Sequence, residues 1–280
     1  MSAQVSIRDA LYEAPGPKTR RRIVIGTIIA SLLVLALVVM VVMQFYKTGQ
    51  LDEKYWSFFL KPSTWLYLGD GFLGTIKVAA VAGGISLVLG LLLMLGRTSG
   101  IRPLEVVSRI IIDFFRGVPS LLLIYFFFLV IPTYGIRMPA FWMITLPVAL
   151  AASGVLAEVF RAGVNAVPKG QTEAALSIGL TPGKTMFKIV LPQALRIVVP
   201  SLISQLVVVV KDTTVAYVVS YPDLMQNARV LITNNDALVS TYFVVAIIYI
   251  LVNYGINHLS IMLARRSGRP VVSRMNENPT

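Results

Sequence analysis

The sequence predicts an all-α integral membrane protein with about six transmembrane helices. Of its 280 residues, 56% are hydrophobic and only 14% are charged. The mean hydropathy is +0.77, and a single water-soluble domain could not bury that much apolar surface. The apolar residues also gather in runs of about 20, the length that crosses roughly 30 Å of hydrocarbon at 1.5 Å per residue.

Six apolar runs are predicted to be spans. The first, residues 23–45, contains no charge and follows Arg20-Arg21-Arg22. This basic flank is typical of a signal peptide, but the apolar run is too long and no small-residue cleavage site follows it. We therefore expect an uncleaved anchor. The other predicted spans are residues 72–95, 118–133, 141–160, 192–210 and 242–263.

The positions of the basic residues predict the orientation, because Lys and Arg gather in cytoplasmic loops. Most of the 25 Lys and Arg residues fall in the segments 1–22, 96–116 and 161–196 and in the C-terminal tail. We therefore expect both termini, and the loop at 168–192, in the cytoplasm. This topology and the anionic lipid headgroups explain the net charge of +12 without any nucleic acid partner.

No metal site or nucleotide site is expected in this chain. It has no cysteine and a single histidine, His258, which excludes a zinc cluster of His and Cys ligands. The stretch from Gly179 to Thr185 resembles a phosphate-binding loop, but only three residues separate its glycines and no strand precedes it. ATP is therefore expected to bind elsewhere, and no cofactor is expected here.

A polar, turn-rich insert, residues 168–192, separates the fourth and fifth predicted spans. Pro168 and Gly170 are expected to break the preceding helix. Glu173 is expected in the first turn of a new helix, where the helix dipole favours an anion. Gly179 is placed to end that helix in the left-handed conformation.

A second short helix is expected to begin with Thr181 as its N-cap and Pro182 as its first residue. The insert would then be two short helices that meet at a bend. Ala174 and Ala175 are small enough to let a partner approach the helix backbone closely. Apolar anchors for that partner are offered by Leu176, Ile178 and Leu180.

This insert resembles the EAA loop of the permease subunits of ABC importers. The family pattern is Glu-Ala-Ala, three residues, Gly, nine residues and Ile-x-Leu-Pro. It is matched by Glu173, Ala174, Ala175, Gly179, Ile189, Leu191 and Pro192. The resemblance implies that the loop, together with Gly170, is the coupling helix that seats in a cleft of the ATP-binding subunit. The alternative is an ordinary amphipathic connector.

Two further stretches resemble the permeases of polar amino acid importers. Residues 115–119 match Phe-Arg-Gly-x-Pro, and residues 157–171 match Ala-Glu-x-Phe-Arg-x-Gly followed by Val-Pro-x-Gly-Gln. Glu158 and Arg161 lie three residues apart on one helix face and are expected to form a structural ion pair. Arg116 is expected to anchor the cytoplasmic boundary.

The end of the fifth span carries Lys211-Asp212-Thr213-Thr214, where this family has Lys-x-Thr-Ser-Leu. A charge inside a span costs about 2.5–3.5 kcal/mol on insertion scales and usually has a role. Lys211, Asp212 and Thr213 are therefore candidates for a gate or a substrate-facing group near the outer mouth. The alternative is an ion pair at the helix end.

Three other features concern helix packing. Ala79 with Gly83, and Ala80 with Gly84, place small residues on one stripe and indicate close helix contact. Lys77 is expected to extend from a helix start to the outer headgroups. Helix kinks are possible at Pro119, Pro147 and Pro200.

The resemblance covers about residues 70–265. It implies the five-helix core of a type I ABC permease, to which the span 23–45 is an addition, with tails at 1–22 and 266–280. The implied role is the permease subunit of an ATP-driven uptake system in the plasma membrane of a bacterium, working by alternating access without covalent chemistry. The segment 12–18 and the junction at Lys211 resemble actinobacterial glutamate importer permeases, which implies glutamate or another polar amino acid.

The implied partners are a dimer of ATP-binding subunits that holds ATP and Mg²⁺, a second permease that is identical or homologous, an external solute-binding protein, and the lipid bilayer. One alternative is an ATP-independent secondary transporter or channel, for which repeated halves or intramembrane carboxylates would be typical. No repeat is evident, and Asp212 is the one plausible buried carboxylate. An intramembrane enzyme would need a His cluster or paired aspartates, which the sequence lacks.

Overall fold

A computed structural model of the chain describes residues 16–266. Within that range the regular elements are all helices, and no strand occurs. The all-α class predicted from composition is therefore confirmed. The chain divides into two compact units, Met1–Ser57 and Phe58–Thr280, and each is described separately.

The first unit is built on one long helix, α2 (Pro17–Lys47). Pro17 at its first position suits a helix start, because the missing N–H would have no helical partner there. The helix contains the predicted span 23–45 and is apolar enough to cross a membrane. None of its residues, all of which the structure describes, is buried, which is the behaviour of a helix whose apolar surface faces lipid or another chain. A short 3-10 turn, η1 (Glu53–Tyr55), follows.

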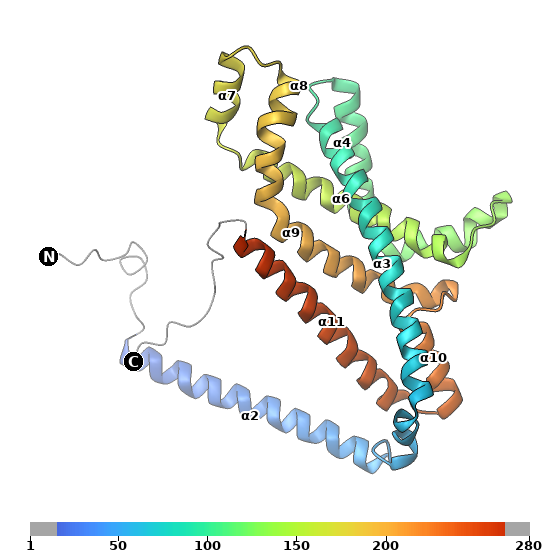
Figure 1. Ribbon diagram of the computed structural model, residues 1–280. Helices are drawn as coiled ribbons and strands as arrows, with labels where there is room; N and C mark the ends of the chain where they lie inside the picture. The colour runs from blue at the N-terminus through green and yellow to red at the C-terminus, as the bar shows by residue number, and fades with distance from the viewer. Residues whose placement is uncertain (1–15, 267–280) are drawn as a thin grey trace. The chain divides into compact units, whose positions relative to one another are not determined.

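The second unit is a helical bundle that begins after a 3-10 turn, η2 (Ser57–Leu60) (Figure 1). Its elements in chain order are α3 (Pro62–Arg97), α4 (Arg102–Gly117), α5 (Ser120–Tyr125), a π-turn η3 (Phe126–Val130), a 3-10 turn η4 (Ile131–Tyr134), α6 (Ala140–Asn165), α7 (Lys169–Ser177), α8 (Pro182–Thr185), a π-turn η5 (Met186–Val190), α9 (Leu191–Asp212), a 3-10 segment η6 (Thr213–Val219), α10 (Leu224–Asn235) and α11 (Leu238–Arg266).

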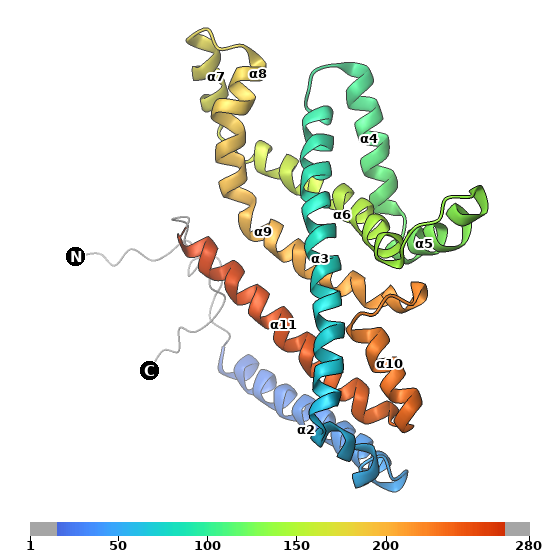
Figure 2. The same ribbon diagram turned by 45° about the vertical axis from the view of Figure 1, so that its right-hand side comes forward.

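The bundle has two distinct ends. Figures 1 and 2 both show α7 and α8 at one end, together with the junction between α3 and α4. Helix α10 lies at the opposite end, beside the beginning of α3, against which it packs. These are called the α7 end and the α10 end below.

Helix α6 lies at the centre of the bundle and packs against α3, α4 and α9. Buried side chains form one cluster toward the α10 end, including Val78, Ile144 and Val209. A second cluster contains Met94, Leu156 and further residues. These clusters are the core that fixes α6 relative to its neighbours, because packed apolar side chains determine which helix faces meet.

Glycines allow these helices to approach closely. A side chain at Gly83 would meet Leu206 of α9 at 2.8 Å, and one at Gly90 would meet Leu156 of α6 at 2.9 Å. Close helix contact was predicted for this stripe, and it is found at Ala79 and Gly83, which are buried. Their neighbours Ala80 and Gly84 are exposed, so only one of the two small-residue pairs packs within the chain.

Among residues 16–266, five helical runs are long and apolar enough to cross a membrane: α2, α3, α6, the run Pro182–Val219 and the run Leu238–Ile256. A sixth crossing results if Arg102–Gly117 and Ser120–Tyr134, which are bent by 98°, count as one. The prediction that residues 118–133 form a span of their own is therefore wrong. Val118 precedes a proline and is extended, with ψ of 125°, because Pro119 disfavours a helical conformation before it.

Helix α3 begins at Pro62, well before the predicted start of that span at residue 72. Lys77 consequently lies several turns inside the helix, and its side chain is exposed there. The expectation that Lys77 sits at a helix start is wrong. The two remaining kink candidates, Pro147 and Pro200, lie inside the continuous helices α6 and α9.

Candidate functional site

The insert between α6 and α9 differs from the prediction at its beginning. Helix α6 ends at Asn165, where the amide of Ala166 donates to the carbonyls of Ala162 and Gly163. Helix α7 then begins at Lys169, so Gly170 lies inside it and breaks no helix. Glu173 follows beyond the first turn, and the expected interaction with the helix dipole is wrong, because that effect fades within one turn.

The bend between the two short helices is as predicted. Gly179 has φ of +85°, the left-handed conformation that glycine adopts without strain. The amide of Gly179 donates to the carbonyl of Leu176 at 2.9 Å, and that of Leu180 donates to Ala175 at 3.2 Å. Thr181 caps α8, accepting from the amide of Lys184 at 3.5 Å. These bonds close both helix ends around Gly179.

The α7 end presents apolar residues to its surroundings. Ile178, beside the bend, is 79% exposed and Leu176 is 44% exposed. Ala174 and Gly170 are also exposed. Ala175, however, is only 4% exposed and packs onto its own chain, so the expectation that it lies on a partner-facing surface is wrong. The exposed small and apolar residues at this end are therefore Ala174, Leu176 and Ile178.

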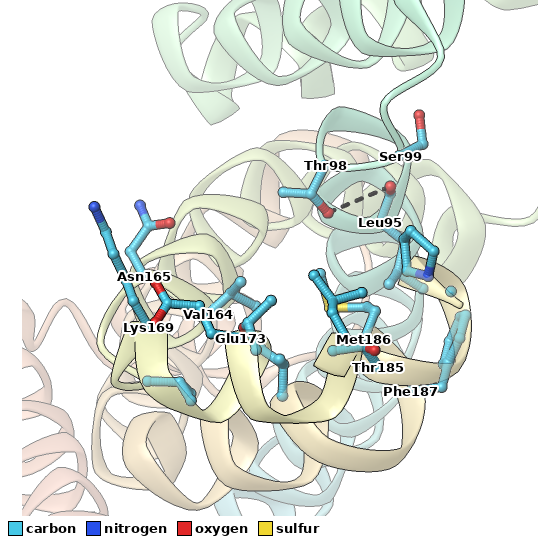
Figure 3. A pocket seen from close by; sticks show the side chains of 16 residues that line it. Leu95, Thr98, Ser99, Val164, Asn165, Lys169, Glu173, Thr185, Met186 and Phe187 are labelled. Atoms are coloured by element: carbon cyan, nitrogen blue, oxygen red, sulfur yellow. Dashed lines mark hydrogen bonds between the residues drawn. The ribbon is translucent and has the colours of Figure 1, made fainter. Parts of the chain in front are cut away.

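A cavity of about 770 Å³ lies beneath α7. Figure 3 shows Lys169, Asn165 and Glu173 on one side of it and Thr98 and Ser99 on the other. The lining between these sides is largely apolar and comes from Leu95, Val164, Val167, Met186, Phe187 and Val190 among others. The cavity separates part of α7 from the ends of α3 and α6.

Few polar groups reach this cavity from its buried wall. Thr185 is 2% exposed, and its hydroxyl has no hydrogen-bond partner among residues 16–266.

Helix α7 packs on α8 and η5, and Gln193 of α9 donates to Gln171 of α7 at 3.2 Å. Helix α7 is thus tied to α9 along one side and borders the cavity on the other.

The Ile-x-Leu-Pro stretch spans the end of η5 and the first two residues of α9. Pro192 is near the helix start and has no N–H to give, so the preceding turn widens into the π-turn η5. The carbonyl of Ile189 accepts a hydrogen bond from Gln193 at 2.9 Å. Ile189 and Leu191 are half-buried, whereas Pro192 is exposed. The motif therefore sets the geometry by which α8 continues into α9.

The predicted ion pair between Glu158 and Arg161 is present, with Nε to Oε2 at 2.8 Å. The same carboxylate also pairs with Arg97, and Arg116 lies 3.9 Å away. Glu158, in the C-terminal third of α6, thus joins the last residue of α3 and the end of α4 to its own helix. The sequence indicated only the local pair, because Arg97 is 61 residues from Glu158 and no short spacing connects them.

Lys211, Asp212 and Thr213 differ in their exposure. Lys211 is exposed, Asp212 is half-buried beside the Ser120 hydroxyl, and Thr213 is fully buried. The Thr213 hydroxyl donates to the carbonyl of Val210 at 2.7 Å, so the expectation that Thr213 faces a path is not supported. Among the side chains that the structure describes, neither Lys211 nor Asp212 forms a salt bridge, which argues against an ion pair at the helix end.

A second polar site, at the α10 end, was not predicted. Asp223 is fully buried, and its Oδ1 accepts from the amide of Gln226 at 2.7 Å as the N-cap of α10. Burial raises the pKa of Asp223 to about 6. The amide of Leu224 donates to Thr75 at 3.1 Å, and Asn227 donates to the carbonyl of Tyr67 at 2.7 Å. An N-cap aspartate before an amphipathic stretch is a local signal that could have revealed α10.

Two glycines of α3 make room for this loop. A side chain at Gly74 would lie 2.3 Å from the carbonyl oxygen of Pro222, and one at Gly71 would lie 2.8 Å from that of Asp223. The loop before α10 therefore rests directly on the backbone of α3. This contact fixes α10 at the end of the bundle opposite α7.

The chain matches known proteins over most of its length. The family described as "Binding-protein-dependent transport system inner membrane component" matches residues 86–269. The glutamate transport system permease protein GluD of Corynebacterium glutamicum is 34% identical over 240 residues, which is 82% of this chain and 88% of that protein. The probable glutamine ABC transporter permease protein GlnP of Bacillus subtilis is 34% identical over 71% of this chain and 91% of its own length.

A solved structure agrees with these relatives. The crystal structure described as an amino acid ABC transporter with histidines superposes with a TM-score of 0.68 and 28% identity, covering 71% of this chain and 94% of that one. The helix order and the exposed loop between α6 and α9 agree with these matches. This chain belongs to the family of inner membrane components of binding-protein-dependent transport systems.

Proposed function

We propose that this chain is the permease subunit of an ATP-driven importer of polar amino acids, with glutamate as the first substrate to test. The observation that carries the proposal is the exposed α7–α8 loop, whose Ile178 is 79% exposed and whose sequence matches the coupling loop of importer permeases. The printed names of GluD and GlnP support glutamate and glutamine as candidate substrates.

The α7 end is proposed to face the cytoplasm of a bacterium, with both termini on that side of the plasma membrane. The support is the distribution of Lys and Arg, which gather in the segments that lead to this end. The α10 end then faces outward. A solute-binding protein would approach there and deliver the amino acid.

The ATP-binding subunits, which would hold ATP and Mg²⁺, are proposed to receive α7 in a cleft. Helix α7 is joined directly to α6 by residues 166–168 and to α9 through α8 and η5. A displacement of α7 is therefore passed to two of the central helices, and the cavity beneath α7 gives it room to move. With a second permease, identical or homologous, the two bundles would open alternately to each side.

The experiment compares two charge substitutions at exposed positions on opposite ends of the bundle. Ile178→Asp places a carboxylate on the proposed docking face, and Asn234→Asp in α10 is the matched control. Burying an isoleucine contributes about 2 kcal/mol, so Ile178→Asp is expected to weaken association with the ATP-binding subunit at least about tenfold. The Asn234→Asp complex is expected to assemble normally.

Association is measured by co-purification of the permease with its ATP-binding subunit, and uptake is measured with labelled L-glutamate and L-glutamine in vesicles. Normal assembly and uptake with Ile178→Asp would refute the coupling assignment. Uptake by the permease alone, without ATP or the ATP-binding subunit, would instead support an ATP-independent transporter.

A further inference from the structure

The cavity beneath α7 has polar groups on two opposite sides and an apolar lining between them. Its volume of about 770 Å³ lies within the range of about 300–1,000 Å³ that is typical of small-molecule sites. Lys169 and Glu173 of α7 line one side, and Thr98 and Ser99, which follow α3, line the other (Figure 3). A ligand with polar groups at both ends and an apolar middle would match this arrangement.

The two charges on α7 have no partner in the described part of the chain. Lys169 and Glu173 lie one helical turn apart and are both exposed. Neither side chain forms a salt bridge with another residue among 16–266. A lysine that precedes a glutamate by four residues is the less favourable order for such a pair. The charges are therefore free to bind the carboxylate and the α-ammonium group of an amino acid.

The opposite side of the cavity offers one acceptor and one donor. The Thr98 hydroxyl donates to the carbonyl of Met94 at 2.9 Å, so its oxygen can still accept a hydrogen bond. The Ser99 hydroxyl oxygen accepts from the amide of Ile101 at 3.2 Å, so its O–H can still donate. A carboxamide matches this pair, because its NH₂ group donates and its carbonyl accepts. An ionised carboxylate matches it less well, since it can only accept.

The middle of the cavity suits methylene groups. Leu95, Val164 and Met186 contribute to its lining, and apolar side chains bind methylene groups favourably because both surfaces are removed from water. An amino acid that carries its carboxamide on methylene groups would thus have a complementary surface for each of its parts. L-Glutamine combines these features and is a suitable probe.

A ligand in this cavity would connect α7 with the end of α3. Helix α7 otherwise packs on α8 and η5 and is bonded to α9 through Gln171 and Gln193. A ligand that binds one position of α7 better than the others favours that position. Occupation of the cavity would therefore oppose the displacement of α7 on which coupling depends.

We propose that the cavity beneath α7 binds a free amino acid with a carboxamide side chain, and that this ligand slows transport by holding α7 in place. The proposal rests on the proposed function and deepens it by adding regulation from the cytoplasm. Lys169 binds the carboxylate and Glu173 the α-ammonium group, while Thr98 and Ser99 bind the carboxamide. Because the site lies at the α7 end, its ligand comes from the compartment that holds ATP.

The test uses the importer complex in proteoliposomes that enclose ATP, so that only complexes with the α7 end toward the lumen are active. The solute-binding protein and labelled L-glutamate or L-glutamine are supplied outside, and unlabelled L-glutamine is enclosed as the probe. Luminal L-glutamine is expected to lower the initial uptake rate. Luminal L-glutamate is expected to need about a tenfold higher concentration for the same inhibition. Equal inhibition by both would overturn the carboxamide assignment, and no inhibition would overturn the regulatory role.

Substitutions at the carboxamide end separate this cavity from inhibition along the transport path. Thr98→Val removes the acceptor, and the concentration for half-maximal inhibition is expected to rise about fivefold, as for one neutral hydrogen bond. Thr27→Val in α2 is the matched control, because the Thr27 hydroxyl also donates to the carbonyl four residues earlier at 2.9 Å. Unchanged inhibition of Thr98→Val would overturn the assignment of the carboxamide to Thr98.

Substitutions of two lysines test the charged end. Lys169→Gln is expected to raise the concentration for half-maximal inhibition about 10-fold to 100-fold, the range for a lost hydrogen bond to a charged group. Lys184→Gln, at an exposed lysine that does not line the cavity, is expected to leave it unchanged. Equal effects of the two substitutions would overturn the proposal.

Equilibrium binding of labelled L-glutamine to the same complex without ATP is a second measurement that does not depend on uptake. Bound L-glutamine is expected to be lost in Lys169→Gln and retained in Lys184→Gln. Failure of the unaltered complex to show ATP-dependent uptake would refute the proposed function. Binding that is the same in both lysine variants would instead refute the cavity as the site.

Discussion

Replacing Gly74 tests whether the backbone contact between α3 and the loop before α10 holds the α10 end together. A Cβ at Gly74 would lie 2.3 Å from the carbonyl oxygen of Pro222, about 1 Å closer than ordinary contact. Gly84, in the same helix, has nothing within 4 Å of an added Cβ. The two glycines therefore form a matched pair that separates steric conflict from helix propensity.

Both substitutions by alanine gain up to about 1 kcal/mol of helix propensity. At Gly84 this gain stands alone. At Gly74 the overpacking costs about 1–3 kcal/mol, and displacement of the loop weakens the bonds from Leu224 to Thr75 and from Asn227 to Tyr67, each contributing about 1 kcal/mol. Gly74→Ala is therefore expected to be about 2–4 kcal/mol less stable than Gly84→Ala.

The assay is thermal unfolding of the purified permease in detergent. At about 2–4 °C per kcal/mol for a protein of this size, the melting temperature of Gly74→Ala is expected to lie about 5–15 °C below that of Gly84→Ala. Association with the ATP-binding subunit at the α7 end is expected to persist below that temperature. Equal melting temperatures for the two variants would refute the reasoning, because they would show that the loop does not rest on α3.

Three further predictions concern single residues. Glu158→Gln removes the carboxylate that Arg97, Arg116 and Arg161 share, although Arg116 keeps Asp113 at 4.0 Å, and it is expected to destabilise the bundle by about 2–3 kcal/mol, between the ranges for exposed and buried pairs. Asp113→Asn, at two exposed pairs with Arg109 and Arg116, is expected to have little effect. Because Arg97 also needs a carboxylate at position 158, the exchange Glu158→Arg with Arg161→Glu should not restore the melting temperature, and full restoration would argue for a simple pair. Burial raises the pKa of Asp223 to about 6, so between pH 4 and 6 the folded state holds a proton that the unfolded state releases. The melting temperature is therefore expected to fall as the pH rises from 4 through about 6 and then to level off. Asp223→Asn should flatten this part of the profile, and an unchanged slope would exclude Asp223 as its source. Gly179→Ala forces a side chain into φ of +85°, which costs about 1–2 kcal/mol. This variant is expected to weaken co-purification with the ATP-binding subunit. The control is Gly183→Ala, because an added Cβ at Gly183 meets no atom within 4 Å.

The features that could be predicted are those that short stretches of sequence encode. Gly179, Thr181 and Pro182 specify the bend between α7 and α8 through backbone preferences alone. The start of α3 was missed because its first turns contain Gly69 and Asp70, so the helix extends beyond the apolar run. A helix is longer than the apolar run that predicts it whenever the helix continues beyond the membrane.

The orientation of side chains could not be predicted in the same way. Ala175 and Thr213 are buried because of the helices that pack against them, and no local pattern indicates those neighbours. Arg97 and Arg116 join Glu158 from elements far apart in the sequence. Motif spacing identified residues 168–192 as a loop between two spans, but only the packed bundle shows which of its residues are exposed.

The arginines around Glu158 have a consequence for how the protein enters the membrane. With the α7 end in the cytoplasm, as proposed above, Arg97, Arg116 and Arg161 lie on separate segments during insertion, before the helices pack, and each would act as a topogenic charge that retains its segment end on that side. After packing, the same three side chains meet on one carboxylate. Loss of Glu158 should therefore disturb assembly and leave topology intact, whereas loss of the arginines would affect both stages of biogenesis.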